Sequence, residues 1–241
     1  MRPQTIQIFL PFGDPRGIRV AEITTRTVQL FDVPRSEITF FFEMSESDQV
    51  AAYYLFGDET EDSRTKCYIG QTGSSRQRFK DHLKNKAFWS RALIAISRIN
   101  TMTATHASYL EWKSISEGYE AGRFSIENSN TGSRPHTPAP LQSECEEIFE
   151  TIGILLATLG YPLFQRMSTA APKSTDYTVF CKGRGADAKG IYSTDGLTVS
   201  KGSKCAVKPT AKATPSSIHS RRTRMIQEGA VEMINGVPVF I

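Results

Sequence analysis

Two short β-prone runs, separated by an acidic stretch rich in turn residues, constrain the fold more than any other feature of this sequence. They are residues 51–56 (AAYYLF) and 67–70 (CYIG), and the segment GDETEDSR lies between them. Two such runs joined by a polar segment predict a β-hairpin. Because side chains alternate along a strand, we expect Tyr53 and Tyr68 to project to one face of the sheet and Tyr54 to the other.

A helix is predicted directly after this hairpin. Ser74 or Ser75 can cap its N-terminus. Arg78 and His82 are four residues apart, so they share one face of the helix. An apolar stripe runs beside them. The helix therefore presents cationic and titratable side chains next to a buried face.

Further along the chain, a single carboxylate and two amides complete a set of polar side chains suited to phosphodiester cleavage. Glu111 lies on a later predicted helix, and Asn128 and Asn130 follow it. Cleaving a phosphodiester requires a water that loses a proton, stabilisation of the phosphate charge, and help for the leaving oxygen. Tyrosine, arginine, histidine, glutamate and asparagine can supply these together.

At these positions the chain resembles the GIY-YIG nuclease superfamily. The second signature tripeptide is intact at residues 68–70, whereas residues 51–53 read Ala-Ala-Tyr where Gly-Ile-Tyr is usual, with the tyrosine kept. The family's arginine falls ten residues after the second tyrosine, at Arg78. The other matching positions, within residues 47–132, are His82, Glu111 and either Asn128 or Asn130.

The resemblance implies a one-metal nuclease site. Glu111 is expected to bind one Mg²⁺ or Mn²⁺, because such ions take few protein ligands and keep several waters. No other small-molecule cofactor is expected. One tyrosine would be the general base and the other would orient water or the metal, and the sequence does not say which. A tyrosine has an ordinary pKa of about 10, so a cation such as Arg78 is needed to lower it. His82, at the rim of the cleft, would relay a proton or bind phosphate. The asparagine would donate to a phosphate oxygen or fix the orientation of a tyrosine.

The resemblance and the hairpin together predict an α+β fold with a small, mainly antiparallel three-stranded sheet flanked by helices. The third strand is expected near residues 93–97. The predicted organisation is a β element over residues 1–46, a GIY-YIG-like nuclease domain over 47–132, a linker and long helix over 133–176, and a small basic α/β module over 177–241. Within the third segment, the helix is predicted over residues 144–159. Because related small domains usually continue further, we expect this module to be truncated.

The C-terminal part resembles a small domain of unknown function that follows the nuclease in one bacterial branch of the superfamily. Residues 190–192 and 196–203 carry its glycine-rich pattern. From Lys182 to Arg224 the chain has ten lysines or arginines and two aspartates, although its whole formal charge is only +4. Such a basic region favours a polyanionic partner. We expect DNA to be bound there, with the candidate contacts Arg221, Arg222 and Arg224. Lys66, just before the second strand of the hairpin, is a further candidate phosphate contact.

Other sequence features exclude several classes of protein. No apolar run approaches the roughly 20 residues needed to span a bilayer. The four cysteines are far apart and lack metal-site spacing, which suits a reducing cytoplasm. We therefore expect a cytoplasmic, metal-dependent DNA endonuclease. The alternative is a catalytically silent nucleic-acid-binding or scaffold protein that retains the fold, which the altered tripeptide at residues 51–53 would favour.

Overall fold

The chain forms two units, and each is described by itself. The computed structural model describes residues 3–58, 64–129, 132–166, 177–193, 196–207 and 216–241. The first unit comprises residues 1–60 and 64–166, and the second comprises residues 61–63 and 167–241. Within the described residues, no helix is both long enough and apolar enough to cross a bilayer.

The first unit contains seven strands and four α-helices among its described residues. In chain order they are β1 (Ile6–Phe9), β2 (Arg19–Ile23), β3 (Val28–Pro34), α1 (Ile38–Glu43), β4 (Ala51–Gly57), β5 (Lys66–Thr72), α2 (Ser75–Asn85), β6 (Trp89–Ser97), α3 (Ala104–Ala121), β7 (Ser125–Ile126) and α4 (Ala139–Thr158).

The sheet is larger than the three strands predicted from the sequence. Its order is β1-β2-β3-β6-β4-β5-β7, and every neighbouring pair is antiparallel except β5 and β7. The predicted strands β4, β5 and β6 form its centre. β6 buries apolar side chains on both faces, including Leu93 and Ile94, which suits a strand with a partner on each side. The N-terminal β element supplies that second partner, because β3 pairs with β6 from Val28 to Pro34.

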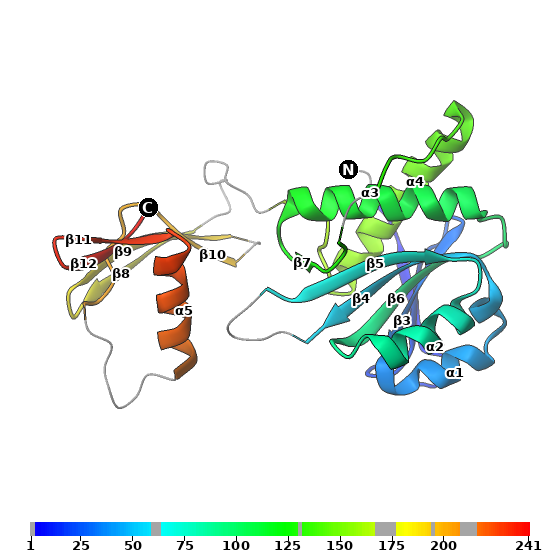
Figure 1. Cartoon of the computed structure of the whole chain (residues 1–241), viewed down its shortest axis with the longest axis horizontal. Coiled ribbons are helices and arrows are strands. Elements are labelled where there is room, and N and C mark those ends of the chain that lie inside the picture. The colour runs from blue at the N-terminus through cyan, green and yellow to red at the C-terminus, as the bar shows by residue number, and fades with distance from the viewer. Residues whose placement is uncertain (1–2, 59–63, 130–131, 167–176, 194–195, 208–215) are drawn as a thin grey trace. The chain divides into compact units, whose positions relative to one another are not determined.

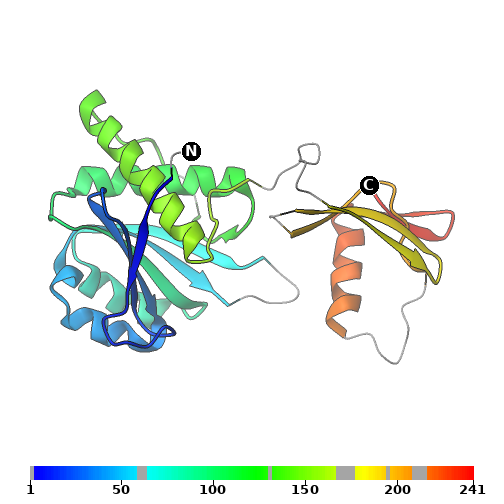
Figure 2. The same ribbon diagram turned by 180° about the vertical axis from the view of Figure 1, so that it is seen from behind.

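Helices cover both faces of this sheet (Figures 1 and 2). α3 and α4 lie on one face, where Leu110 and Ile152 pack against a core that contains Tyr54. α1 and α2 lie on the other face, where Phe41 and Phe79 pack against a core that contains Tyr53. The class is therefore α+β, with two hydrophobic cores separated by one sheet.

Local signals explain where α3 begins and ends and why α4 can begin at a proline-containing turn. Thr103 and His106 form a capping box at the start of α3, and Gly122 ends the helix in the left-handed conformation, with φ of 65°. α4 begins at Ala139, earlier than the predicted start at Glu144. Pro140 does not prevent this, because a proline in the first turn loses no helical hydrogen bond.

The second unit is a small α/β module. Its described elements are β8 (Tyr177–Gly183), β9 (Ala186–Ser193), β10 (Gly196–Val199), α5 (Ser216–Gln227), β11 (Val231–Ile234) and β12 (Val237–Phe240). β9 pairs with both β8 and β10, and β11 pairs with β12. Lys204 bridges to Asp187 on one side and to Val239 on the other, which joins the two sets of strands.

Candidate active site

The hairpin of β4 and β5 places the two signature tyrosines on one face of the sheet. Tyr53 pairs with Gly70, and Leu55 pairs with Tyr68, so the tyrosines are diagonal neighbours. Their ring centroids are 6.4 Å apart. Tyr54 projects into the opposite core, where its hydroxyl group is hydrogen-bonded to Ser114 at 2.9 Å. The alternation expected from the sequence thus separates the tyrosine pair from its neighbour.

The glycine of the intact tripeptide makes room for the other tyrosine. A Cβ atom built at Gly70 would lie 2.9 Å from Cε2 of Tyr53 and closer still to its hydroxyl oxygen. Tyr53 is wholly buried and cannot move aside easily. A glycine opposite Tyr53 is therefore a packing requirement of this site.

The α2 helix supplies both hydrogen-bond partners of the Tyr53 hydroxyl group. Arg78 donates from Nε to Tyr53 Oη at 3.0 Å, and His82 Nε2 lies 2.7 Å from the same oxygen. The oxygen accepts from Arg78, and the direction of its hydrogen bond with His82 depends on which ring nitrogen of His82 carries the hydrogen.

Burial strongly affects the ionisation of Tyr53 and His82. Burial raises the pKa of Tyr53, and the hydrogen bond from Arg78 only partly opposes this. The pKa of His82 is lowered to about 4, mainly by burial and further by the positive charges of Arg78 and Lys86. His82 is only 4% exposed, so it lies beneath the surface and not at the rim where the sequence suggested a proton relay.

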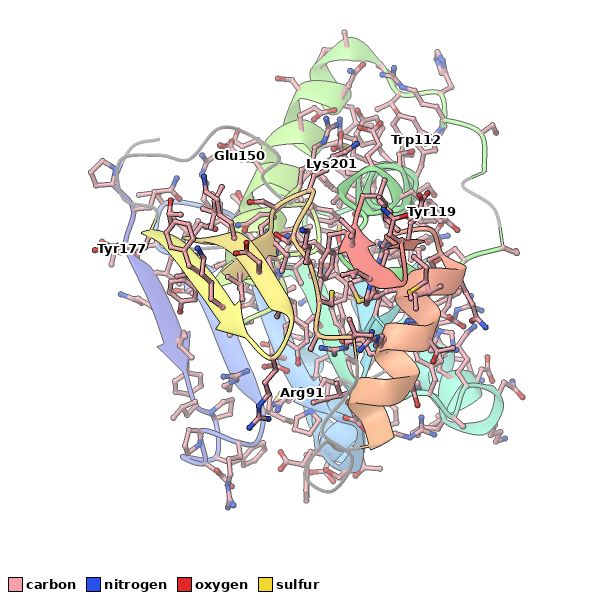
Figure 3. All side chains as sticks on the ribbon, turned by 90° about the vertical axis from the view of Figure 1, so that its left-hand side faces the viewer. Arg91, Trp112, Tyr119, Glu150, Tyr177 and Lys201 are labelled. Atoms are coloured by element: carbon pink, nitrogen blue, oxygen red, sulfur yellow. The ribbon has the colours of Figure 1, made fainter. Side chains whose placement is uncertain are left out.

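An open pocket of about 340 Å³ lies beside this network and contains three of the residues singled out from the sequence. Tyr68, Glu111 and Asn128 line it, together with Ser108 and Trp112. Figure 3 labels Trp112 on the ribbon of α3, the helix that also carries Glu111. Tyr68, unlike Tyr53, is therefore accessible to a ligand.

Glu111 is half-buried at this pocket. Burial raises the pKa of its carboxyl group, while the charge of Arg78 and a hydrogen bond from the backbone N–H of Gln71 oppose the increase. The same arginine is influenced by both tyrosines, since hydrogen bonds from its guanidinium to Tyr53 and Tyr68 raise its own pKa. Arg78 thus couples the buried tyrosine, the accessible tyrosine and the carboxylate.

Asn128 is held against the strand that carries Tyr68. Its Oδ1 accepts from the backbone N–H of Ile69 at 3.0 Å, and its Nδ2 donates to the carbonyl oxygen of Ile69 at 2.8 Å. The side chain therefore pairs with β5 as a neighbouring strand would. This geometry makes Asn128 a positioning residue for Tyr68, and the other candidate, Asn130, lies outside the described residues.

The candidate DNA contacts are not part of this pocket. Lys66, at the start of β5, forms an ion pair with Glu127 at 3.3 Å. Arg221, Arg222 and Arg224 belong to α5 in the second unit. Arg222 donates to the carbonyl oxygen of Val207 at 3.4 Å, and Arg224 is paired with Glu228 at 3.9 Å.

Two cations near the tyrosine and the pocket were missed in the sequence. Lys86 places its Nζ 3.8 Å from the ring centroid of Tyr68. It continues the row of Arg78 and His82 at a spacing of four residues, so the helical period could have revealed it. Arg134 lies 5.5 Å from the ring centroid of Trp112. No local periodicity marks Arg134, because it comes from an irregular segment.

Comparisons with known proteins match only the end of the chain. Residues 179–241 are similar to a family described as "Domain of unknown function (DUF4357)". No curated protein and no solved structure matches the chain. The match lies within the second unit and does not include the tyrosine pair or the pocket.

Proposed function

We propose that the first unit is a divalent-metal-dependent endonuclease of the GIY-YIG type that hydrolyses DNA in the cytoplasm. The observation that carries this proposal is the meeting of Tyr68 and Glu111 in one open pocket, with Arg78 close enough to influence both. The hairpin of β4 and β5, with β6, α2 and α3, would be the GIY-YIG-like part of the larger sheet.

The donor atoms of the pocket fit a hard divalent cation. Glu111 supplies a carboxylate, and Tyr68 and Ser108, which carry hydroxyl groups, are also among the residues that line the pocket. Within the described residues there is no group of three or more His, Cys, Asp or Glu side chains that could bind a metal. Mg²⁺ suits such a site, because it is commonly held by one or two carboxylates and keeps its waters. Glu111 would hold Mg²⁺ or Mn²⁺, which when bound stabilises negative charge on the phosphate.

The roles of the side chains follow from their accessibility. Tyr68 is the tyrosine that can reach a nucleophilic water, since Tyr53 is buried and its hydroxyl group is already hydrogen-bonded to Arg78 and His82. Arg78 would hold a non-bridging phosphate oxygen and stabilise the charge that develops there. Tyr53 would keep Arg78 in place through their hydrogen bond, and His82 would in turn hold the hydroxyl group of Tyr53. Asn128 would fix the strand that carries Tyr68.

The deciding experiment is plasmid nicking in Mg²⁺ with Glu111→Ala. We expect at least about a 100-fold loss of cleavage, comparable to removal of a main electrostatic element of an active site. Glu117→Ala is the matched control, because this carboxylate lies on the same helix and is paired with Lys113 away from the pocket. Cleavage by Glu111→Ala at the wild-type rate would refute the proposed function.

A catalytically silent nucleic-acid-binding protein is the second candidate. The specific observation in its favour is the altered tripeptide, in which Ala51 and Ala52 stand before a wholly buried Tyr53. This candidate predicts that the wild-type protein binds DNA without nicking it in Mg²⁺ or Mn²⁺. The same assay therefore separates the two functions.

A further inference from the structure

The second unit exposes an aromatic side chain on a sheet face that also carries lysines. Phe180 on β8 is 66% exposed. It lies directly opposite Lys189 of β9, and Lys182 lies directly opposite Asp187. Cross-strand partners share a face, so these four side chains project to the same side of the sheet. An exposed phenyl ring beside cations is suited to a ligand that offers both a surface to pack on the ring and negative charge for the cations.

These side chains surround a shallow hollow of about 250 Å³, which Lys201, Gly202 and Ser203 complete. The loop after β10 is fixed to the edge of the sheet. Ser203 Oγ accepts from the backbone N–H of Lys189 at 3.1 Å and donates to its carbonyl oxygen at 3.0 Å. The N–H of Gly202 donates to the carbonyl oxygen of Phe240 at 2.8 Å. Figure 3 labels Lys201 on this loop. The hollow is therefore already formed.

The charge of the hollow favours an anion. Three lysines line it against one aspartate. Lys182 is 3.9 Å from Asp187, and both side chains are largely exposed, so this ion pair is weak. Neither Lys189 nor Lys201 forms an ion pair with a carboxylate that the structure describes. Two cations thus remain available for phosphate groups next to the exposed ring.

The opposite face of the same sheet provides an internal comparison. It also exposes aromatic side chains, Tyr177 and Tyr192, which lie directly opposite each other. However, the neighbouring residues on that face are Val179, Gly190 and Val199, which carry no charge. Among the described residues of β8, β9 and β10, the Phe180 face combines a stacking surface with cations, whereas the Tyr177 face has no cation.

We propose that the hollow between Phe180, Lys189 and Lys201 binds single-stranded nucleic acid, with one base stacked on Phe180 and the adjacent phosphates contacted by the lysines. A base stacked on an exposed aromatic ring of a sheet, with its backbone in a basic groove, is how single strands are commonly recognised. A duplex hides its bases and cannot stack on the ring. An acidic peptide would form ion pairs with the lysines but would have no base to stack on the ring.

The inference deepens the proposed function, because it names a single-stranded segment as the ligand of the second unit, but it can be measured independently. The full-length protein is titrated into labelled 15-nucleotide oligothymidylate in EDTA, where metal-dependent cleavage is absent, and binding is followed by fluorescence anisotropy. We expect Phe180→Ala to weaken binding by about 5- to 100-fold, the range for loss of one stacked base. Phe180→Trp should retain the affinity.

The control is Tyr177→Ala, which removes an equally exposed ring from the opposite face. It should leave the affinity within about twofold, because the described strand residues on that face carry no positive charge. Oligouridylate in place of oligothymidylate tells whether RNA binds as well as DNA. Because Phe180 is exposed, its replacement leaves no cavity, and urea unfolding checks that the variants stay folded.

Three outcomes would overturn the inference. They are an unchanged affinity in Phe180→Ala, an equal loss for single-stranded and duplex DNA, and displacement of the oligonucleotide by polyglutamate as effectively as by unlabelled oligothymidylate. A failure of Glu111→Ala to abolish nicking would count against the proposed function alone. The two proposals therefore fail separately.

Discussion

At the scale of single residues, the site depends on close packing around Tyr53. Its ring is buried against Phe79, with ring centroids 5.1 Å apart, and its hydroxyl group is engaged by Arg78 and His82. Gly70 is the residue directly across the hairpin. Any side chain at this position must displace the ring and so disturb both partners on α2.

We expect Gly70→Ala to destabilise the protein by about 1–3 kcal/mol, the usual cost of overpacking a core. If Arg78 acts as proposed, cleavage should fall as well, because Tyr53 then no longer holds Arg78 in place. Gly73→Ala is the matched control, since a Cβ atom there would have no heavy atom within 4 Å. Equal unfolding midpoints of the two variants in urea would contradict the packing requirement.

The lowered pKa of His82 predicts how the free energy of unfolding depends on pH. Its pKa in the folded protein is about 4, against an ordinary value of 6.5, so the unfolded chain binds the proton more readily. The free energy of unfolding should therefore rise with pH between about 4 and 6.5 and stay level above that range. Urea unfolding at several pH values measures this slope.

His82→Gln should reduce that pH dependence, because glutamine does not titrate. His136→Gln is the control, since this histidine lies on an exposed loop and its loss should leave the slope intact. A slope that survives unchanged in His82→Gln would assign the pH dependence to other groups.

At the scale of elements, a buried carboxylate joins three strands of the sheet. Asp32 on β3 is wholly buried and accepts hydrogen bonds from Arg19 on β2 at 2.9 Å and from Arg91 on β6 at 2.7 Å. Figure 3 labels Arg91. The network fixes the N-terminal strands to β6, and thus to the hairpin that carries the tyrosines. We infer that it supports the site from a distance.

Removing this carboxylate should be costly, because two arginines are then left without their common partner. We expect Asp32→Ala to lower the free energy of unfolding by about 3 kcal/mol, at the lower end for a broken buried ion pair because the arginines are each about a quarter exposed. Asp48→Ala is the control, since its pair with Arg76 is largely in water. Equal melting temperatures of the two variants would disprove the role of Asp32.

At the scale of the whole molecule, chemistry and electrostatic binding are assigned to different units. The proposed catalytic residues belong to the first unit, whereas the arginines of α5 belong to the second. The partners of Arg222 and Arg224 are weak, since these two side chains are held at 3.4 Å and 3.9 Å. Phosphate groups can therefore compete for them.

Neutralising Arg221, Arg222 and Arg224 together should weaken binding to every DNA sequence alike. The slope of log affinity against log salt should become shallower by about 0.9 for each phosphate that the protein no longer neutralises. Cleavage at saturating DNA should change little, because the pocket is untouched. Arg16→Gln, an exposed arginine of the first unit, serves as the control. An unchanged salt slope in the triple variant would instead favour a protein partner for α5.

Local periodicity in the sequence was sufficient to predict the hairpin, the shared face of Tyr53 and Tyr68, and the row of Arg78 and His82. These features follow from the two-residue repeat of a strand and the helical spacing of i and i+4, which the backbone itself imposes. The α+β class was predicted from the hairpin together with the family resemblance. The predicted start of α4 was wrong. The prolines up to Pro140 indicate a loop, but a proline is tolerated in the first turn of a helix.

Only the tertiary structure decided which segments cover one another. The pairing of β3 with β6 extends the sheet beyond three strands, and it joins residues about 60 positions apart that no local pattern relates. The two signature tyrosines look equivalent in the sequence but differ in accessibility. Tyr68 lines the pocket, whereas Tyr53 is wholly buried. The hydrogen bond between Asn128 and Ile69 and the contact of Arg134 with the ring of Trp112 also depend on the tertiary structure, because loops bring these residues together. Accessibility and proton affinity are properties of the packed chain, because both depend on the neighbours that exclude water.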